Sequence, residues 1–409
     1  MCPSGSVFDS GFVGLMFYFV GNLIVLTAVV FGMEFVTLCT GHHDARAIVE
    51  RDVSDAMAAW DGVWYQRIAS DGYSYDPERM SNIAFFPLFP MTARCVAKVT
   101  GLRMHDAMLL TSHGFLMAAF WIAGVYLHKR AKQRDSGRES QFVLLAMAVY
   151  PTTFYLRMSY SESSFLCASL LAMLGMVCRW PTLAIAMIIG VATAARSVGV
   201  ALILPFLWHL WCERKSTGRF LYQAALLMPV CVSGLAAFMI FQWQAFGDPL
   251  AFVKAHRHWY ERIPPESYWD RIVAHVTLEP LWRVYDPTSH CCWSHEPPTG
   301  FPLFSMQFMN PIFVLASWIA IGWGAYRIVL SGKEVWLSLG LLAIPYLTHN
   351  YRSCCTAEGR LASVIFPFYI VLGFWLSHLP QALSTGLIAI MSILLAAYTA
   401  LFIQWYWFY

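Results

Sequence analysis

The sequence predicts an all-α, polytopic membrane protein, and three observations support this fold class. Of its 409 residues, 58% are hydrophobic and only 12% are charged, whereas an ordinary soluble domain carries about 25% charged residues. Apolar stretches of about 20 residues, the length that crosses a hydrocarbon core, recur from end to end. The basic residues stand in short loops between these stretches, and the net charge of +3 is too small to indicate nucleic-acid binding.

The first apolar stretch runs over residues 11–39 and is interrupted only by Glu34. No small-residue cleavage site follows it, so we interpret it as a retained first span rather than a signal peptide. The further crossing segments are 106–128, 140–158, 162–178, two short segments within 181–211 that meet near Thr193–Arg196, 220–243, 302–328, 335–349, 361–378 and 384–405.

Residues 40–105 form the predicted first outer loop. Residues 48–68 in this loop show broken helical periodicity with several aromatic side chains, as in helices that lie in the membrane interface. Residues 83–99 are apolar but short, and Pro87 and Pro90 interrupt them, which favours a segment that does not cross the membrane.

Basic loops at 129–138, 214–219 and 327–333 orient the chain, because cytoplasmic loops carry an excess of Lys and Arg. The result is a single transmembrane domain over residues 1–409, with about eleven spans, the N-terminus inside and the C-terminus outside. This topology places the first outer loop, a long loop over residues 244–301 and every unusual polar cluster on the outer side.

Asp61 is the strongest candidate for a catalytic residue. It follows Trp60 and precedes Trp64 and Tyr65 in a chain that is short of charge. A carboxylate among interfacial aromatic residues is partly desolvated and is therefore a better general base than one in water. The alternative is an aromatic belt with an incidental acid.

Two further polar clusters interrupt apolar segments. Arg157, Tyr160 and Glu162 stand between two spans, where ionisable residues indicate function by default, although Arg157 and Glu162 could simply pair. Arg196 stands where the two short segments meet, and a guanidinium there needs either an anionic ligand or a carboxylate partner.

Basic residues gather in two outer segments. The segment FGDPLAFVKAHRHW carries Lys254, Arg257 and His258, and this cluster either binds a lipid phosphate or is a solvated basic loop. The loop HNYRSCCTAEGR ends on Arg360, for which we also predict a phosphate contact.

Four cysteines belong to two outer loops, where disulfides form more readily than in the cytoplasm. They are Cys291, Cys292, Cys354 and Cys355. No CxxC or HxxxH spacing indicates a metal site, and we expect neither a metal nor another cofactor.

Six pieces of the sequence, in order, resemble the GPI mannosyltransferase II (PIG-V-like) family of GT-C glycosyltransferases. They extend over most of the chain and read WDGVWYQRIASDGYSY, NIAFFPLFP, SYSESSF, TAARSVG, FGDPLAFVKAHRHW and EGRLASVIFPFYIVLG. The resemblance implies a GT-C-type fold and transfer of mannose from a polyprenyl-phosphate-mannose donor on the non-cytoplasmic side.

The resemblance also implies roles for individual residues. Asp61 matches the family's acidic residue and would act as general base in an inverting transfer. Arg196, Lys254, Arg257 and Arg360 would bind the donor phosphate. The substrate-binding candidates are Trp60, Trp64, Tyr65, Tyr160, Glu162 and His258.

The expected partners are the lipid-linked donor, a glycan or glycolipid acceptor, membrane lipids and a possible accessory membrane subunit. The FGDPLAF piece looks like the bacterial branch of the family, which favours a bacterial plasma membrane over an endoplasmic reticulum membrane. Two alternative functions are a transporter that uses Arg157, Glu162 and Arg196, and a non-catalytic subunit of a glycosylation complex.

Overall fold

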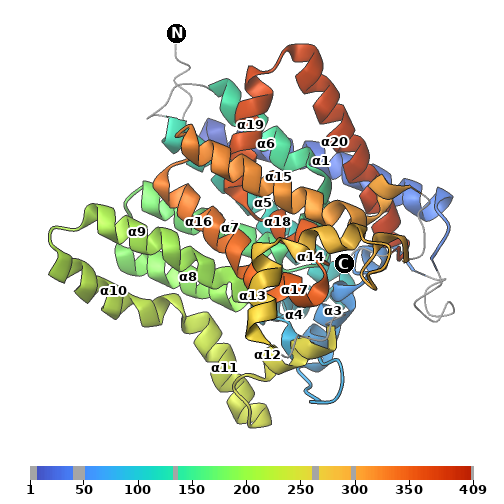
Figure 1. Cartoon of the computed structure of the whole chain (residues 1–409), viewed down its shortest axis with the longest axis horizontal. Helices are drawn as coiled ribbons and strands as arrows, with labels where there is room; N and C mark the ends of the chain where they lie inside the picture. The colour runs from blue at the N-terminus through green and yellow to red at the C-terminus, as the bar shows by residue number, and fades with distance from the viewer. Residues whose placement is uncertain (1–6, 40–50, 132–136, 260–266, 296–300, 407–409) are drawn as a thin grey trace.

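A computed structural model describes residues 7–39, 51–131, 137–259, 267–295 and 301–406 of the chain (Figure 1). Within these ranges the regular structure is helical and no β-strand occurs. The predicted all-α fold class is therefore confirmed.

Four helices are long and apolar enough to cross a membrane, by length and composition. They are α1 (Val7–Phe35), α5 (Met104–Ala131), α15 (Met306–Tyr326) and α20 (Gln381–Ile403). At 1.5 Å per residue, even 21 residues extend about 30 Å, which matches a hydrocarbon core. The polytopic membrane character is confirmed, and the count of eleven spans stays a prediction.

Two bent pairs raise the number of candidate spans in the described ranges to six. The first pair joins η3 (Pro151–Arg157) to α7 (Glu162–Val177) with a 98° bend. The second joins α10 (Thr217–Cys231) to α11 (Ser233–Phe246) with a 47° bend. Pro229 lies inside α10 and removes a helical hydrogen bond close to that second bend.

Shorter helices complete the bundle: α6 (Gly137–Val149), α8 (Thr182–Ala195), α9 (Ile203–Glu213), α16 (Gly332–Pro345) and α19 (Phe366–His378). The prediction of two short segments meeting near Arg196 is confirmed, because α8 ends at Ala195 and Arg196 is extended with φ −156° and ψ 151°. The turn η4 (Ser197–Leu202) then leads into α9.

Close approach of α1 and α5 depends on two glycines. A Cβ atom at Gly14 would stand 2.1 Å from the carbonyl oxygen of Phe120, and one at Gly124 would stand 2.1 Å from that of Ser10. Small residues let membrane helices approach to backbone contact, where van der Waals packing replaces the missing hydrophobic driving force. α1 also packs against α20, and α5 against α7.

Short helices of the predicted outer loops gather in one region, the lower middle of Figure 1, where α3, α4, α12, α13, α14 and α17 are labelled. The N-terminal group is α2 (Val53–Ala56), α3 (Asp61–Asp71), η2 (Asn82–Ala84) and α4 (Leu88–Thr100). The 244–304 group is α12 (Ala251–Ala255), η5 (His256–Trp259), α13 (Tyr268–Val276), α14 (Glu279–Trp282), η6 (Arg283–Tyr285), η7 (Trp293–His295) and η8 (Pro302–Phe304). The third group is η9 (Tyr346–Asn350), α17 (Tyr351–Ser353) and α18 (Glu358–Ala362).

The first outer loop over residues 40–105 stays a prediction. Residues 40–50 lie outside the described residues, and the helix that carries the interfacial aromatic side chains is α3. α4 has 13 residues, a length of about 20 Å, and is not among the candidate spans of the described chain.

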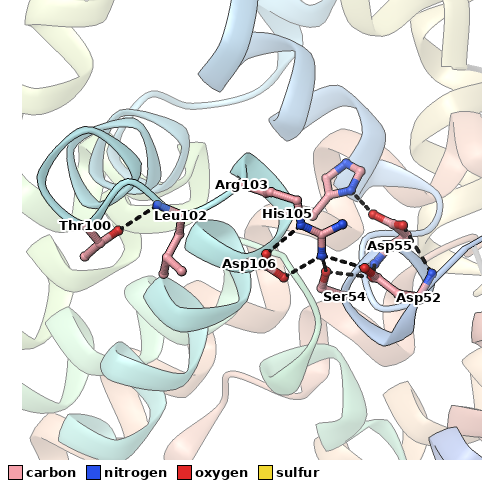
Figure 2. Close-up of polar contacts among 8 residues, drawn as sticks. All are labelled: Asp52, Ser54, Asp55, Thr100, Leu102, Arg103, His105 and Asp106. Carbon is pink, nitrogen blue, oxygen red and sulfur yellow. Dashed lines mark hydrogen bonds and ion pairs between the residues drawn. The ribbon is translucent and has the colours of Figure 1, made fainter.

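A group of ion pairs joins α2 to the start of α5. Figure 2 shows the Arg103 guanidinium between the carboxylates of Asp52 and Asp106, and the His105 ring next to Asp55. Asp52 also caps α2 by accepting from the Asp55 backbone N–H at 3.0 Å. These ion pairs therefore fix α2, which ends five residues before Asp61.

A disulfide joins Cys291 to Cys354, with a Cα–Cα distance of 6.0 Å and a sequence separation of 63 residues. It ties the long 244–301 loop to the segment that leads into α18. A bridge between these two loops was one of the sequence-based possibilities, whereas Cys292 and Cys355 are buried free thiols.

Loss of this disulfide is expected to lower stability. A cross-link that closes a loop of 63 residues removes chain entropy worth roughly 4 kcal/mol from the unfolded state. We expect the Cys291→Ser, Cys354→Ser double variant to melt at a lower temperature in detergent than the wild type. Cys95→Ser, at an exposed free cysteine, is the control. An unchanged melting temperature in the double variant would show that the bridge contributes little.

Candidate active site

Asp61 is the first residue of α3 and is buried, with 7% of its surface exposed. The preceding Trp60 has a left-handed backbone, with φ 58°, which is uncommon for a bulky residue and is found mainly at functional sites. The Asp61 backbone N–H donates to the Tyr160 hydroxyl at 3.1 Å, and this hydroxyl donates to the Ala59 carbonyl at 3.1 Å. These two bonds fix the start of α3 against the turn before α7.

Two arginines and two carboxylates from four separate segments form one ion cluster. Arg360 of α18 donates to Asp61 through Nη1 and to Glu162 through Nε. Arg196, between α8 and η4, donates to the same Glu162 oxygen, Oε1. The other oxygen, Glu162 Oε2, is buried and has no hydrogen-bond partner among the described residues. Asp61, Glu162, Arg196 and Arg360, hereafter the ion cluster, carry two negative and two positive charges.

Tyrosines line this cluster. The Arg360 guanidinium lies over the Tyr160 ring, 4.4 Å from its centroid. The Tyr65 hydroxyl makes a 2.7 Å hydrogen bond with Ser161 Oγ. Burial by itself lowers the pKa of Arg360. The charges of Glu162 and Asp61 raise this pKa by more than burial lowers it, so Arg360 stays cationic.

Arg157 does not pair with Glu162, so that interpretation of the sequence is wrong. The Arg157 guanidinium is fully buried and donates to Asn22 Oδ1 at 2.9 Å and to the carbonyls of Thr153 and Ala148 at 3.0 Å. These acceptors come from α1, η3 and α6, so Arg157 ties three elements together behind the site. Arg196, in contrast, pairs with a carboxylate, which is one of the two kinds of partner that the sequence predicted for it.

The predicted basic residues of the 244–301 loop do not join the ion cluster. Lys254 pairs with Asp248 at 2.6 Å and is half exposed, and Arg257 is exposed. His258 contacts the Pro77 carbonyl through Nε2 at 2.9 Å. These three residues stand on α12 and η5, beside the first outer loop.

The predicted aromatic residues on either side of Asp61 in the sequence pack against other segments. The Trp60 ring packs 5.2 Å from that of Trp405, near the C-terminus. The Trp64 ring lies 5.7 Å from that of Trp259 and stacks on Phe85 at 6.1 Å.

Two histidines that the sequence-based site left out lie within electrostatic reach of the ion cluster. Burial lowers the pKa of His256, and the nearby Asp61 charge partly opposes this shift. Burial, His256 and the charges of Arg360 and Arg196 lower the pKa of His349 to about 4. Both histidines are therefore neutral at pH 7. The sequence signal was their place inside the two basic outer segments.

Glu358, at the start of α18, is a buried carboxyl group beside the Asn350 amide. Burial raises its pKa to about 8 from 4.5, so the folded protein binds this proton more tightly than the unfolded chain. The stabilising effect of the bound proton is complete below about pH 4.5 and is lost as pH rises towards about 8. A buried acid that lowers stability at neutral pH is found mainly where a site needs it.

The Glu358→Gln variant is therefore expected to be more stable than the wild type at neutral and alkaline pH. At pH 7 the gain in the free energy of unfolding amounts to roughly 3 kcal/mol, because a tenfold difference in proton affinity between the folded and unfolded chain is worth about 1.4 kcal/mol. Melting temperatures at pH 5, 7 and 9 measure it. A gain that is the same at all three values would contradict the raised pKa.

Potential metal ligands meet at one place in the described ranges, where His290, Cys291 and Cys354 lie within 4.8 Å of one another. The two cysteines form the disulfide, and a disulfide offers no thiolate to a metal. These residues as they stand therefore do not fit a metal ion.

Comparison with known proteins assigns the chain to a family. No curated protein matches the chain. Among solved structures, the chain is similar to the apo form of an oligosaccharyltransferase from Archaeoglobus fulgidus, with 13% identity and a TM-score of 0.41. The match covers 94% of this chain but only 55% of the other protein. A likeness at this level says nothing about activity.

The family comparison is more specific. Residues 27–263, more than half of the chain, match the model of the mannosyltransferase (PIG-V) family. The matched region contains Asp61, Glu162 and Arg196 of the ion cluster, and the chain's apolar helices fit a membrane-embedded glycosyltransferase. The chain therefore belongs to the mannosyltransferase (PIG-V) family.

Proposed function

We propose that this glycosyltransferase moves mannose from a polyprenyl-phosphate-mannose donor to a hydroxyl of a lipid-linked or surface glycan acceptor. The ion cluster carries the proposal, because it places a candidate base and two guanidinium groups in one buried site. We infer mannose as the sugar from the family description. The two guanidinium groups of the cluster suit an anionic, lipid-linked donor in a membrane.

Asp61 is the general base in this proposal. It deprotonates the acceptor hydroxyl, whose oxygen attacks the anomeric carbon of mannose while the bond to the lipid phosphate breaks. A single displacement with one base inverts the anomeric centre, unlike a double displacement through two carboxylates. The Tyr160 hydrogen bond to the Asp61 backbone and the ion pair with Arg360 hold the carboxylate in place.

Arg360 and Arg196 bind the departing phosphate. Each already holds a carboxylate of the cluster, and guanidinium groups match phosphate oxygens equally well. Neutralised phosphate is a good leaving group, so the reaction needs no separate acid. Lys254 and Arg257, on the exposed side of α12 and η5, attract the anionic donor towards the cluster.

Aromatic and polar side chains around the cluster bind the sugars. Stacking on apolar rings and hydrogen bonds to hydroxyls are the contacts that such groups offer. Glu162 contributes Oε2, which has no partner within the described chain. The proposed set is Trp60, Trp64, Tyr65, Tyr160, Glu162 and His258.

We further propose that the site faces the non-cytoplasmic side of a bacterial plasma membrane, or the endoplasmic reticulum lumen if the source is eukaryotic. The Cys291–Cys354 disulfide supports this orientation, because disulfides persist in oxidising compartments. The positive-inside pattern of the basic loops supports it independently.

Purified protein in nanodiscs with radiolabelled polyprenyl-phosphate mannose and a glycolipid acceptor tests the function. We expect wild type to release mannose from the lipid donor and not from nucleotide-linked mannose. Transfer from the nucleotide sugar alone would overturn the donor assignment. Absence of transfer from every lipid-linked sugar, in folded protein, would contradict the proposed reaction and favour a non-catalytic subunit.

A further inference from the structure

The proton acceptor of the reaction stands in an unusual environment. Asp61 already forms an ion pair with Arg360, so this guanidinium occupies one of its two carboxylate oxygens. Within the described chain, His256 is a further titratable group, and the Asp61 charge raises its pKa against the effect of burial. It stands on η5, which follows α12 directly.

Packing fixes the position of His256. Phe252 and Ala255 of α12 belong to an apolar cluster with Ile83 and Phe86 of the first outer loop. The Phe252 ring packs 5.5 Å from that of Phe86, and its backbone N–H donates to Gln242 of α11 at 2.9 Å. α12 is therefore docked against the loop that carries Asp61.

A chain of ring contacts leads from His256 to α3. The His256 ring lies 6.2 Å from that of Trp259, which lies 5.7 Å from that of Trp64. Trp64 and Asp61 are three residues apart on α3, so they share one face of that helix. Ring contacts therefore link His256, through Trp259 and Trp64, to the helix that begins at Asp61.

A single hydrogen bond determines the tautomer of His256. Its Nδ1 lies 2.6 Å from the Phe252 carbonyl oxygen, which can only accept, so Nδ1 carries the hydrogen. In the neutral ring Nε2 then presents a lone pair, and this atom has no hydrogen bond to the described residues. His258 is arranged the other way, with Nε2 as the donor to Pro77.

We propose that His256 shares the proton-accepting role with Asp61, through an Nε2 atom that binds the acceptor hydroxyl. This inference rests on the proposed glycosyl transfer. The acceptor oxygen forms its bond to the anomeric carbon, and the bond to the phosphate oxygen breaks with its electron pair left on phosphate. The hydroxyl proton passes first to Nε2 and then to the Asp61 carboxylate, whose negative charge stabilises the transient imidazolium.

The charges around His256 favour this exchange. The negative charge of Asp61 raises the pKa of His256, and His349 of η9 is a neutral neighbour. Burial keeps the pKa of His256 below its ordinary 6.5, so the ring is unprotonated and ready at pH 7. Activity is therefore expected to fall only when pH drops below the ordinary pKa of a histidine.

The substitution His256→Asn separates a catalytic role from a structural one. Asparagine still donates to the Phe252 carbonyl but has no atom at the Nε2 position. We expect kcat to fall about 100-fold with little change in the donor KM, and the acid limb of the pH profile to disappear. His256→Gln, which retains an acceptor but cannot take a proton, is expected to be similarly slow. Full activity of His256→Asn would overturn the proposal.

His378→Asn is the matched control. Its Nδ1 contacts the carbonyl four residues earlier, that of Phe374, at 2.8 Å, so it repeats the local arrangement of His256. His378 is exposed and ends α19, away from the ion cluster. This variant is expected to keep wild-type activity.

A measurement without substrate tests the pairing itself. In histidine-labelled protein, NMR titration of His256 is expected to shift to lower pH in Asp61→Asn, because the carboxylate charge that raises its pKa is gone. An unshifted titration would overturn the pairing whatever the substrate. A shifted titration in a protein that transfers no sugar would support the pair and contradict the proposed function.

Discussion

Asp61→Asn is expected to abolish sugar transfer while the protein still inserts and folds. Asparagine has nearly the same shape and keeps the backbone hydrogen bond to Tyr160, but it takes no proton and carries no charge. General-base catalysis contributes about 10²- to 10⁴-fold, and the loss falls on kcat. Transfer rates with saturating lipid-linked donor measure it.

The control for this variant is Asp71→Asn, at the other end of α3. Asp71 is exposed, lies outside the ion cluster and is expected to tolerate the change. If Asp61→Asn turned over at the wild-type rate, Asp61 would have no role in catalysis, and the base would have to be sought elsewhere.

Arg360→Met is expected to be the most destructive change outside Asp61. Arg360 is the residue that joins Asp61 to Glu162, and its side chain is only 10% exposed. Its removal leaves two buried carboxylates with Arg196 as the remaining guanidinium of the ion cluster. Loss of one partner of a buried ion pair costs about 3–5 kcal/mol, because an uncompensated charge remains. We expect a lower melting temperature and no detectable transfer.

Arg360→Lys separates charge from geometry. Lysine keeps the positive charge but cannot contact both carboxylates through the two arms of a planar fork. We expect stability between that of wild type and Arg360→Met, and a donor KM raised more than kcat is lowered. Equal stability of the lysine variant and wild type would show that the bridge between Asp61 and Glu162 has little energetic value.

The sequence singled out all four members of the ion cluster because charge is rare in this chain. Asp61, Glu162, Arg196 and Arg360 each interrupt or border an apolar stretch, where an ionisable side chain is costly and needs a reason. In the structure these four side chains form one cluster, and their catalytic roles stay predictions. Lys254 and Arg257 gave the same compositional signal, but in the structure they lie outside the cluster.

The sequence was less informative about partners. It left open whether Arg157 pairs with Glu162, five residues away. In the structure Glu162 pairs instead with two arginines that are 34 and 198 residues away in the sequence. Sequence proximity is a poor guide here, because the 98° bend between η3 and α7 turns the two side chains towards different helices.

The sequence by itself determined the all-α class, the break at Arg196 and the family, because hydrophobic period, length and rare charges are local properties of a chain. Only the tertiary structure decided which carboxylate meets which guanidinium, and it also brought His256 within reach of the Asp61 charge. Such contacts depend on how helices distant in sequence pack, and here glycine contacts, the docked α12 and the Cys291–Cys354 bridge set that packing.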